Sequence, residues 1–264
     1  MLINIINART NTFFIDRFSA AQNQAWCILG SNRSGIHDFF RLISGEDIQV
    51  SADCFNLPEN PGIISFKKQQ EIYESELKKD DTDFMDKLDP GTLSREFIED
   101  IKRHGVLIDA FDLRPCMDKG YRELSTGQSR KLMLLSEFSK NRSCLIIEAP
   151  YDGLDPLSCK ELDQALYHLH RQGILLVLFV CNRSDIPFWC THTCIISKGK
   201  IGLQDTRENV FEFLDRELDN EAPDFKASVQ DLDNDRGKGL ISPDHKKLVR
   251  INQGIARYGG KTIF

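Results

Sequence analysis

The apolar run at residues 174–181 (ILLVLFVC) constrains the fold of this chain more than any other feature of its sequence. A short run of this kind is typical of a strand buried on both faces of a parallel sheet, and it falls far short of the roughly 20 residues that a membrane-crossing helix needs. Upstream, residues 144–147 have the pattern of another strand, and residues 158–171 that of a helix between the two. Strands that alternate with helices predict a mainly parallel sheet with covered faces.

Other segments extend this α/β pattern toward both ends of the chain. Further strands are predicted over residues 26–29, 63–66 and 193–197, and helices over 36–44, 93–111 and 128–138. With 41% hydrophobic residues in 264, the chain has enough apolar material for one large domain.

Charge and cysteine usage exclude several classes of function. The net charge of -6, with acidic residues gathered near the C-terminus, offers no basic stripe to a nucleic acid. Polar residues interrupt the N-terminal segment, so it does not have the pattern of a secretory signal, and we expect a cytoplasmic location. Cys190, His192 and Cys194 match no zinc-binding spacing, and buried reduced thiols are the preferred interpretation.

A glycine loop joins the strand at 26–29 to the helix at 36–44. It consists of Gly30, Ser31, Asn32, Arg33, Ser34, Gly35, Ile36 and His37. A phosphate loop, GxxxxGK[ST], would lie in this position, with backbone N–H groups around the phosphates, a lysine on the outer phosphates and a hydroxyl on magnesium. Here Ile36 takes the lysine position and His37 the hydroxyl position, so the loop alone fits an ordinary strand-to-helix turn better than a phosphate loop.

A second loop suited to phosphate lies before the helix at 128–138. Its residues are Leu124, Ser125, Thr126, Gly127 and Gln128. Small hydroxyl and glycine residues at a helix N-terminus bind a terminal phosphate through backbone N–H groups, the serine hydroxyl and the helix dipole. The alternative is a plain serine or threonine N-cap, which the same loop can also form.

The strand at 144–147 leads through Glu148, Ala149 and Pro150 into residues 151–155 (YDGLD). In order and spacing, the two loops and this segment resemble the ATP-binding cassette (ABC) family, in which they are the phosphate loop, the signature loop, the Walker B strand and the D-loop. Within that family the chain most resembles the N-terminal cassette of ModF-type molybdate-transport proteins, which carry two cassettes. Residues 26–32, 81–83, 124–128, 151–155 and 182–187 carry this resemblance. It implies a P-loop fold with a mainly parallel sheet, a small N-terminal antiparallel part and a helical subdomain at about 67–130, within a domain covering 1–212.

Several positions depart from the family pattern. Ile36 lacks the cation for the outer phosphates, and Glu148 replaces the Walker B aspartate, which leaves only a displaced carboxylate for Mg²⁺. Ala149 stands where the general base is expected and cannot accept a proton from water. Asn182 replaces the histidine of the H-loop. No catalytic residue is therefore assigned on this chain, and we expect ATP and Mg²⁺ to bind its own Walker surface weakly or not at all.

Two further elements of a nucleotide site are the Q-loop glutamine and the ring that stacks on adenine. The Q-loop glutamine is expected just past the strand at 63–66, as Gln69 or Gln70, although both fit a solvated helix face equally well. No aromatic residue takes the adenine-stacking position ahead of the phosphate loop, because Phe13 and Phe14 fit strand core better.

The C-terminal part begins with an acidic stretch. Residues 213–246 are predicted to be a solvated linker. Residues 247–264 alternate like a strand and resemble the opening strand of a second cassette, with Tyr258 placed to stack on adenine. The alternative is a C-terminal strand that pairs with the domain's own sheet.

The resemblance implies a division of labour between two cassettes. ABC cassettes hold ATP between the phosphate loop of one and the signature loop of the other, so Ser125, Thr126, Gly127, Gln128 and Asp155 are expected to complete the ATP site of a partner cassette. An integral-membrane permease at the inner membrane is a further expected partner. The alternatives are a non-hydrolysing docking module and an ABC ATPase that is not coupled to transport.

Overall fold

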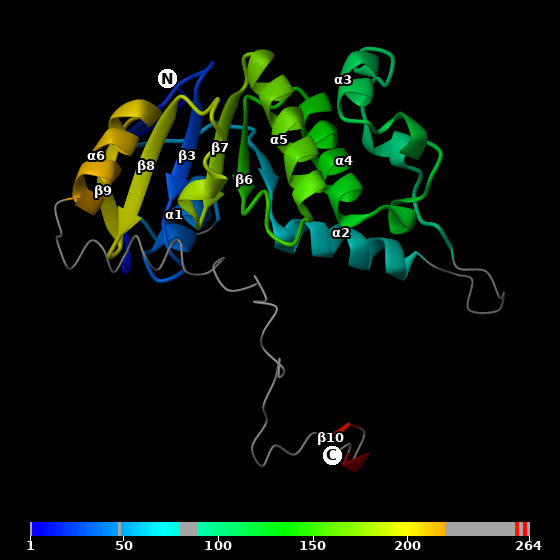
Figure 1. Cartoon of the computed structure of the whole chain (residues 1–264), viewed down its shortest axis with the longest axis horizontal. Helices are drawn as coiled ribbons and strands as arrows, with labels where there is room; N and C mark the ends of the chain where they lie inside the picture. Colours follow the sequence, from blue (N-terminus) through cyan, green and yellow to red (C-terminus); the bar gives the residue numbers. More distant parts are fainter. Residues whose placement is uncertain (1, 47–48, 80–88, 220–256, 259–260, 263–264) are drawn as a thin grey trace, which may run out of the picture.

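The computed structural model describes residues 2–46, 49–79, 89–219, 257–258 and 261–262. Nine strands form one sheet in the order β4-β1-β2-β9-β8-β3-β7-β6-β5 (Figure 1). The strands are β1 (Ile3–Arg9), β2 (Phe14–Ala20), β3 (Ala25–Leu29), β4 (Cys54–Asn56), β5 (Gly62–Ile64), β6 (Cys144–Glu148), β7 (Leu175–Val180), β8 (His192–Ser197) and β9 (Lys200–Thr206). The α-helices are α1 (Ile36–Ile43), α2 (Phe66–Lys78), α3 (Gly105–Ala110), α4 (Thr126–Ser139), α5 (Pro156–Arg171) and α6 (Arg207–Asp219).

The centre of the sheet is parallel and its N-terminal edge is antiparallel. Strand β3 pairs in parallel with β7 and β8, and β5, β6 and β7 continue the parallel part. Strand β1 pairs antiparallel with β2 on one side and with β4 on the other, and β8 pairs antiparallel with β9. The predicted mainly parallel sheet with a small antiparallel N-terminal part is confirmed.

Side-chain alternation along β3 divides the core into two layers. Ala25, Cys27 and Leu29 belong to the apolar cluster that α4 and α5 cover, while Trp26 and Ile28 belong to the cluster that α1 and the β1–β2 pair cover. Figure 1 shows α4 and α5 side by side next to β6, with α3 beyond them and α2 running beneath them in this view. Since parallel strands buried on both faces read as continuous apolar runs, the runs in β3 and β7 follow from this arrangement.

The helix predicted over residues 93–111 is wrong in its extent. The structure has a 3-10 turn at Ser94–Phe97, further turns, and then α3 from Gly105. The backbone N–H and the hydroxyl of Ser94 both donate to the carbonyl of Lys119, and Asp100 takes a left-handed φ of 47°. These two features interrupt a continuous helix, and turns bring the apolar residues to the core instead.

The C-terminal predictions fall largely outside the described residues. Helix α6 runs to Asp219, so the first residues of the acidic stretch are helical. Residues 220–256 are not described, and β10 (Arg257–Tyr258) and β11 (Lys261–Thr262) pair with each other. The linker and the strand of a second cassette stay predictions.

Two observations concern a metal site at the cysteines and a membrane-crossing helix, neither of which the sequence favours. Cys190 is buried and its thiol donates to the carbonyls of Ala25 and His192, both at 3.1 Å. Within the described ranges, no three His, Cys, Asp or Glu side chains are grouped to hold a metal ion, and no helix has the length and apolarity to cross a membrane.

Candidate functional site

The glycine loop between β3 and α1 has a shape fixed by its own hydrogen bonds. The Ser34 hydroxyl donates to the Ser31 carbonyl at 2.7 Å and accepts from the Ile36 N–H at 3.3 Å. Gly35 has a φ of 96°, and a Cβ there would lie 2.9 Å from the Phe13 ring and 3.0 Å from Gly199. The loop therefore keeps the turn of a phosphate loop, and position 35 requires glycine.

Ile36 occupies the lysine position as a core residue. Its side chain is 6% exposed and packs in the same apolar cluster as Phe39 and Phe40. No cation projects from this position toward the space beside the loop.

His37 and Glu148, which the sequence places at the hydroxyl and Walker B positions, contact each other. His37 Nδ1 lies 3.0 Å from Glu148 Oε1, and the two side chains are 65% and 27% exposed. Magnesium is held by oxygen ligands, and this pair offers one carboxylate that already has a histidine partner. The donor set differs from the serine or threonine hydroxyl and aspartate of the phosphate-loop pattern.

Ala149 follows Glu148 in a left-handed conformation. Its φ is 44°, and its N–H donates to the Phe179 carbonyl at 2.9 Å. A methyl group at the position of the general base has no proton acceptor, so the side chain at this site cannot activate water.

A cavity of about 470 Å³ opens beside the phosphate loop. It is lined by Asn32, Ile36, His37, Phe40, Phe66, Glu148, Ala149, Asp152, Phe179 and Cys181. Neither glutamine proposed for the Q-loop lines it: the Gln69 side chain donates to the Ser129 hydroxyl at 2.7 Å, and Gln70 donates to Glu74 at 2.8 Å. Phe66, the first residue of α2, takes the place on the cavity wall.

The predicted core positions Phe13 and Phe14 differ from each other. Phe13 is 3% exposed and its ring stacks on Phe39 at 5.5 Å. Phe14 is half-buried and lies under the Arg9 guanidinium at 4.8 Å. Both rings are engaged within the domain.

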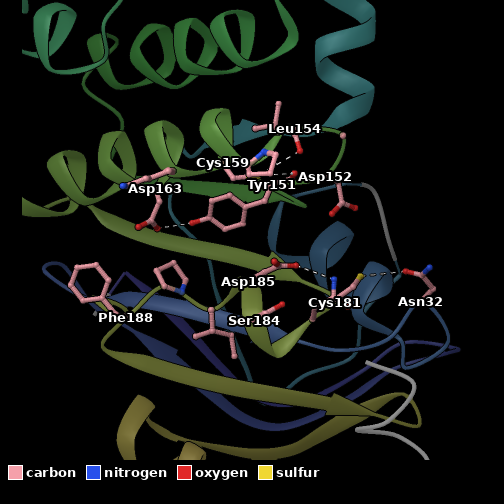
Figure 2. Close-up of a pocket in the computed structure, with 16 residues that line it drawn as sticks. Asn32, Tyr151, Asp152, Leu154, Cys159, Asp163, Cys181, Ser184, Asp185 and Phe188 are labelled. Carbon is pink, nitrogen blue, oxygen red and sulfur yellow. Dashed lines mark hydrogen bonds between the residues drawn. The ribbon is translucent and has the colours of Figure 1, made fainter. Parts of the chain in front are cut away.

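A second cavity of about 800 Å³ lies between the D-loop and residues 181–188 (Figure 2). Figure 2 shows Tyr151 pointing at Asp163, whose Oδ1 accepts from the Tyr151 hydroxyl at 2.9 Å and from Trp189 Nε1 at 3.0 Å. At the H-loop position, the Asn182 amide donates to Asp185 at 3.0 Å. This cavity combines a rigid aromatic wall with acidic side chains.

The signature loop forms the N-terminus of α4. The Gln128 N–H donates to the Ser125 hydroxyl at 3.2 Å, and the Ser125 N–H donates to the Gln128 side chain at 3.1 Å, which is a capping box. Ser125 and Thr126 are exposed. The N-cap interpretation is therefore correct. It leaves the loop accessible to a partner.

Gly127 lies close to the start of α5. A Cβ on Gly127 would meet the Ser158 hydroxyl at 3.0 Å and its Cβ at 3.2 Å. At the N-terminus of α5, Asp155 accepts from the N–H groups of Leu157 and Ser158 and from the Ser158 hydroxyl at 2.6 Å. The Ser158 hydroxyl, with the backbone N–H groups, holds the pKa of Asp155 below its usual value. The signature loop and the D-loop thus share a contact through Ser158.

Arg130 makes a second link between these loops that the sequence alone did not indicate. It is 6% exposed, and its Nη1 donates to the carbonyls of Pro150 at 2.7 Å, Asp152 at 2.9 Å and Ala149 at 3.3 Å. Burial lowers the pKa of Arg130, although a guanidinium stays charged. A basic residue in the first helical turn after the signature loop was the one signal that the sequence offered.

Comparison with known proteins agrees with this geometry. The chain is 23% identical over 261 residues to the ABC transporter ATP-binding protein ModF of Escherichia coli, covering 96% of this chain and 53% of that protein. It is 24% identical over 196 residues to the uncharacterized ABC transporter ATP-binding protein YhaQ of Bacillus subtilis, covering 68% of this chain and 61% of that protein. The chain is an ATP-binding cassette domain.

Solved structures share the fold of this cassette. The cbiO1 protein of Clostridium perfringens, part of the ABC transporter complex cbiONQ, matches with a TM-score of 0.59 at 18% identity over 87% of this chain and 98% of that one. An ATP binding subunit of an ABC transporter matches with a TM-score of 0.60 at 15% identity, over 89% of this chain and 99% of that one. No family model matches the cassette.

The family relation sets what is normal at this site. ABC cassettes bind ATP with Mg²⁺ and work as dimers or with membrane permease subunits. The cassette described here spans about half the length of the ModF relative and 61% of YhaQ.

Proposed function

We propose that this cassette is the degenerate half of a pair, and that its signature loop completes an ATP site whose phosphate loop belongs to a second cassette. The observation that carries the proposal is a contrast between two loops of one domain. Ser125 and Thr126 are exposed on a capped helix N-terminus. In the domain's own site, Ile36 stands in place of the lysine cation and Ala149 in place of the general base.

The contrast is one of charge as well as of chemistry. A lysine on the outer phosphates neutralises a full unit of charge, and Ile36 supplies none. The N-terminus of α4 presents roughly half a positive charge together with free N–H groups, which suits a terminal phosphate held by a partner. Binding of ATP to this cassette's own Walker surface is accordingly weak or absent. The competent ATP site is the one formed by the partner's phosphate loop and this cassette's signature loop.

A second cassette, in the same chain or as a separate subunit, is the partner this function requires. A permease at the inner membrane and a cytoplasmic location belong to the same proposal. The link to molybdate rests on the resemblance to ModF-type proteins alone, because no side chain of a cassette selects the transported substrate.

The test uses this chain together with a second, catalytically competent cassette. Ser125→Arg places a bulky cation against the partner's ATP and is expected to lower ATP turnover at least tenfold. Ser75→Arg, on the exposed face of α2, is the matched control and is expected to leave turnover unchanged. Equal turnover in the two variants would refute the role of the signature loop.

A non-hydrolysing docking module is the second candidate, and the His37–Glu148 contact favours it because the two side chains satisfy each other without magnesium. Calorimetry with ATP and Mg²⁺ on the two-cassette preparation separates the candidates. Saturable binding that Ser125→Arg weakens supports the first, and no binding of ATP supports the second.

A further inference from the structure

The cavity beside the phosphate loop has the wrong chemistry for a phosphate. Its floor is made by Phe40 and Phe179, which are 4% and 3% exposed and pack edge to face at 5.3 Å. Phe66 stands at the wall with 68% of its surface exposed, and Ile36 adds an aliphatic face. Asn32 and His37 are the neutral polar side chains with N–H donors in this lining, and the aromatic and aliphatic side chains give no donors to phosphate oxygens.

The charged residues at the cavity are acidic. Glu148 and Asp152 line it, His37 contacts Glu148 Oε1 through Nδ1 at 3.0 Å, and no lysine or arginine is among the lining residues. Arg130, in the neighbouring helix α4, donates hydrogen bonds from Nη1 to the backbone carbonyls of Pro150 and Asp152. The N-terminus of α1 adds roughly half a positive charge, which two carboxylates outweigh. The charged lining therefore favours a cation.

We propose that this cavity is a binding site for a primary ammonium group carried on an apolar stem. The stem would lie against Phe40, Phe66 and Phe179. The ammonium would face Asp152 and Oε2 of Glu148, whose Oε1 contacts His37. Aromatic faces attract cations through the ring quadrupole, and a nearby carboxylate adds a charge-assisted hydrogen bond. The cavity volume of about 470 Å³ admits a stem of a few carbons or one aromatic ring.

Two sources can supply this chemistry: a free hydrophobic amine and the lysine side chain of a partner protein. The proposal does not rest on the role of the signature loop, because the cavity is built from α1, β6, β7 and the start of α2. Ser125→Arg leaves these elements intact, so failure of the proposed function and failure of this inference are distinguishable.

Fluorine NMR on the full chain tests the charge preference with three probes of one shape. 4-Fluorobenzylammonium is expected to bind at least tenfold more tightly than 4-fluorobenzyl alcohol and 4-fluorobenzoate. Binding of the benzoate as tight as that of the ammonium, or no binding of the ammonium at millimolar concentration, would overturn the proposal. Nα-acetyl-lysine methylamide is the probe for a protein source, and tighter binding of this probe than of the benzylammonium assigns the site to a partner's lysine.

Variants locate the site. Phe66→Ser and Asp152→Asn change exposed positions, so both are expected to fold and to weaken ammonium binding at least fivefold. Phe188→Ser is the matched control, since Phe188 is 75% exposed and lines only the other cavity. Glu148→Gln is expected to weaken binding likewise, with Glu71→Gln on the exposed face of α2 as its control. Equal loss in the control variants would contradict the location.

Discussion

Replacing Arg130 by methionine would measure how strongly α4 holds the turn at residues 149–152. The guanidinium donates to the carbonyls of Pro150 and Asp152 at 2.7 and 2.9 Å, while the contact with Ala149 at 3.3 Å is weaker. A hydrogen bond from a charged donor contributes about 1.5–3 kcal/mol, so the two short bonds together contribute about 3–6 kcal/mol. Methionine keeps the apolar stem and removes the cost of burying the charge, which reduces the net loss.

We therefore expect Arg130→Met to lower the free energy of unfolding by about 2–4 kcal/mol. In a domain of this size, that loss corresponds to a melting temperature lower by roughly 4–16 °C. Urea unfolding followed by the fluorescence of the buried Trp26 and Trp189 gives the free energy. Arg95→Met is the matched control, because the Arg95 side chain is 50% exposed and its partner Asp118 is 84% exposed. The control is expected to change stability by less than about 0.5 kcal/mol.

Hydrogen exchange separates a local role of Arg130 from a global one. If the guanidinium holds the turn, the amides of residues 151–155 exchange faster in Arg130→Met under conditions in which the strands β3 and β7 stay protected. Arg130→Lys keeps the charge on a smaller donor and is expected to recover part of the stability. A stability of Arg130→Met within about 0.5 kcal/mol of the unsubstituted chain, with unchanged exchange, would refute the reasoning.

Three further changes have signs that the structure fixes. Gly35→Ala forces a left-handed alanine against neighbours at 2.9 and 3.0 Å and is expected to cost about 2–4 kcal/mol, whereas Gly45→Ala, with a φ of 75° and no atom within 4 Å, costs only about 1 kcal/mol, as urea unfolding would show. Burial by itself raises the pKa of Glu76, but hydrogen bonds from Lys79 and Thr92 outweigh it and leave this pKa below the ordinary 4.5. The contribution of Glu76 is therefore present above pH 4.5 and lost as the pH falls through the folded-state value. The difference in urea midpoint between the unsubstituted chain and Glu76→Gln should shrink between pH 7 and pH 3, and a difference that does not vary with pH would contradict this. Asp163→Ala removes the acceptor of two buried donors, the Tyr151 hydroxyl and Trp189 Nε1, and is expected to cost about 2–3 kcal/mol. It should also shift the tryptophan emission. Asp163→Asn keeps an oxygen acceptor, so its emission should be closer to that of the unsubstituted chain.

The parallel core could be predicted from the sequence because a strand buried on both faces is a continuous apolar run. The run at 174–181 became β7, and the strand, loop and helix at 26–44 became β3 and α1. The segment at 93–111 misled the same reasoning. Apolar residues at intervals of three and four are needed by any segment that contacts a core on one side, and turns anchored at Ser94 and Asp100 meet that need as well as a helix does.

Some features of the candidate site could likewise be predicted from the sequence, and others could not. The replacements at Ile36, Ala149 and Asn182 are visible in a sequence, because they stand at fixed places in a motif. Phe66 on the cavity wall and the Arg130 contacts are not, because they depend on where α2 begins and on how α4 approaches the D-loop. These depend on distances between segments that are far apart in the chain.

The shape of the glycine loop between β3 and α1 is explained by packing. Gly35 is fixed by Phe13 and Gly199, and Ile36 fills an apolar cluster, so the loop is specified by its neighbours in the core and not by a nucleotide. The same holds for the signature loop, where Gly127 lies against Ser158. Under the function proposed above, this packing would let a cassette with a degenerate site of its own present a correctly shaped signature loop to a partner.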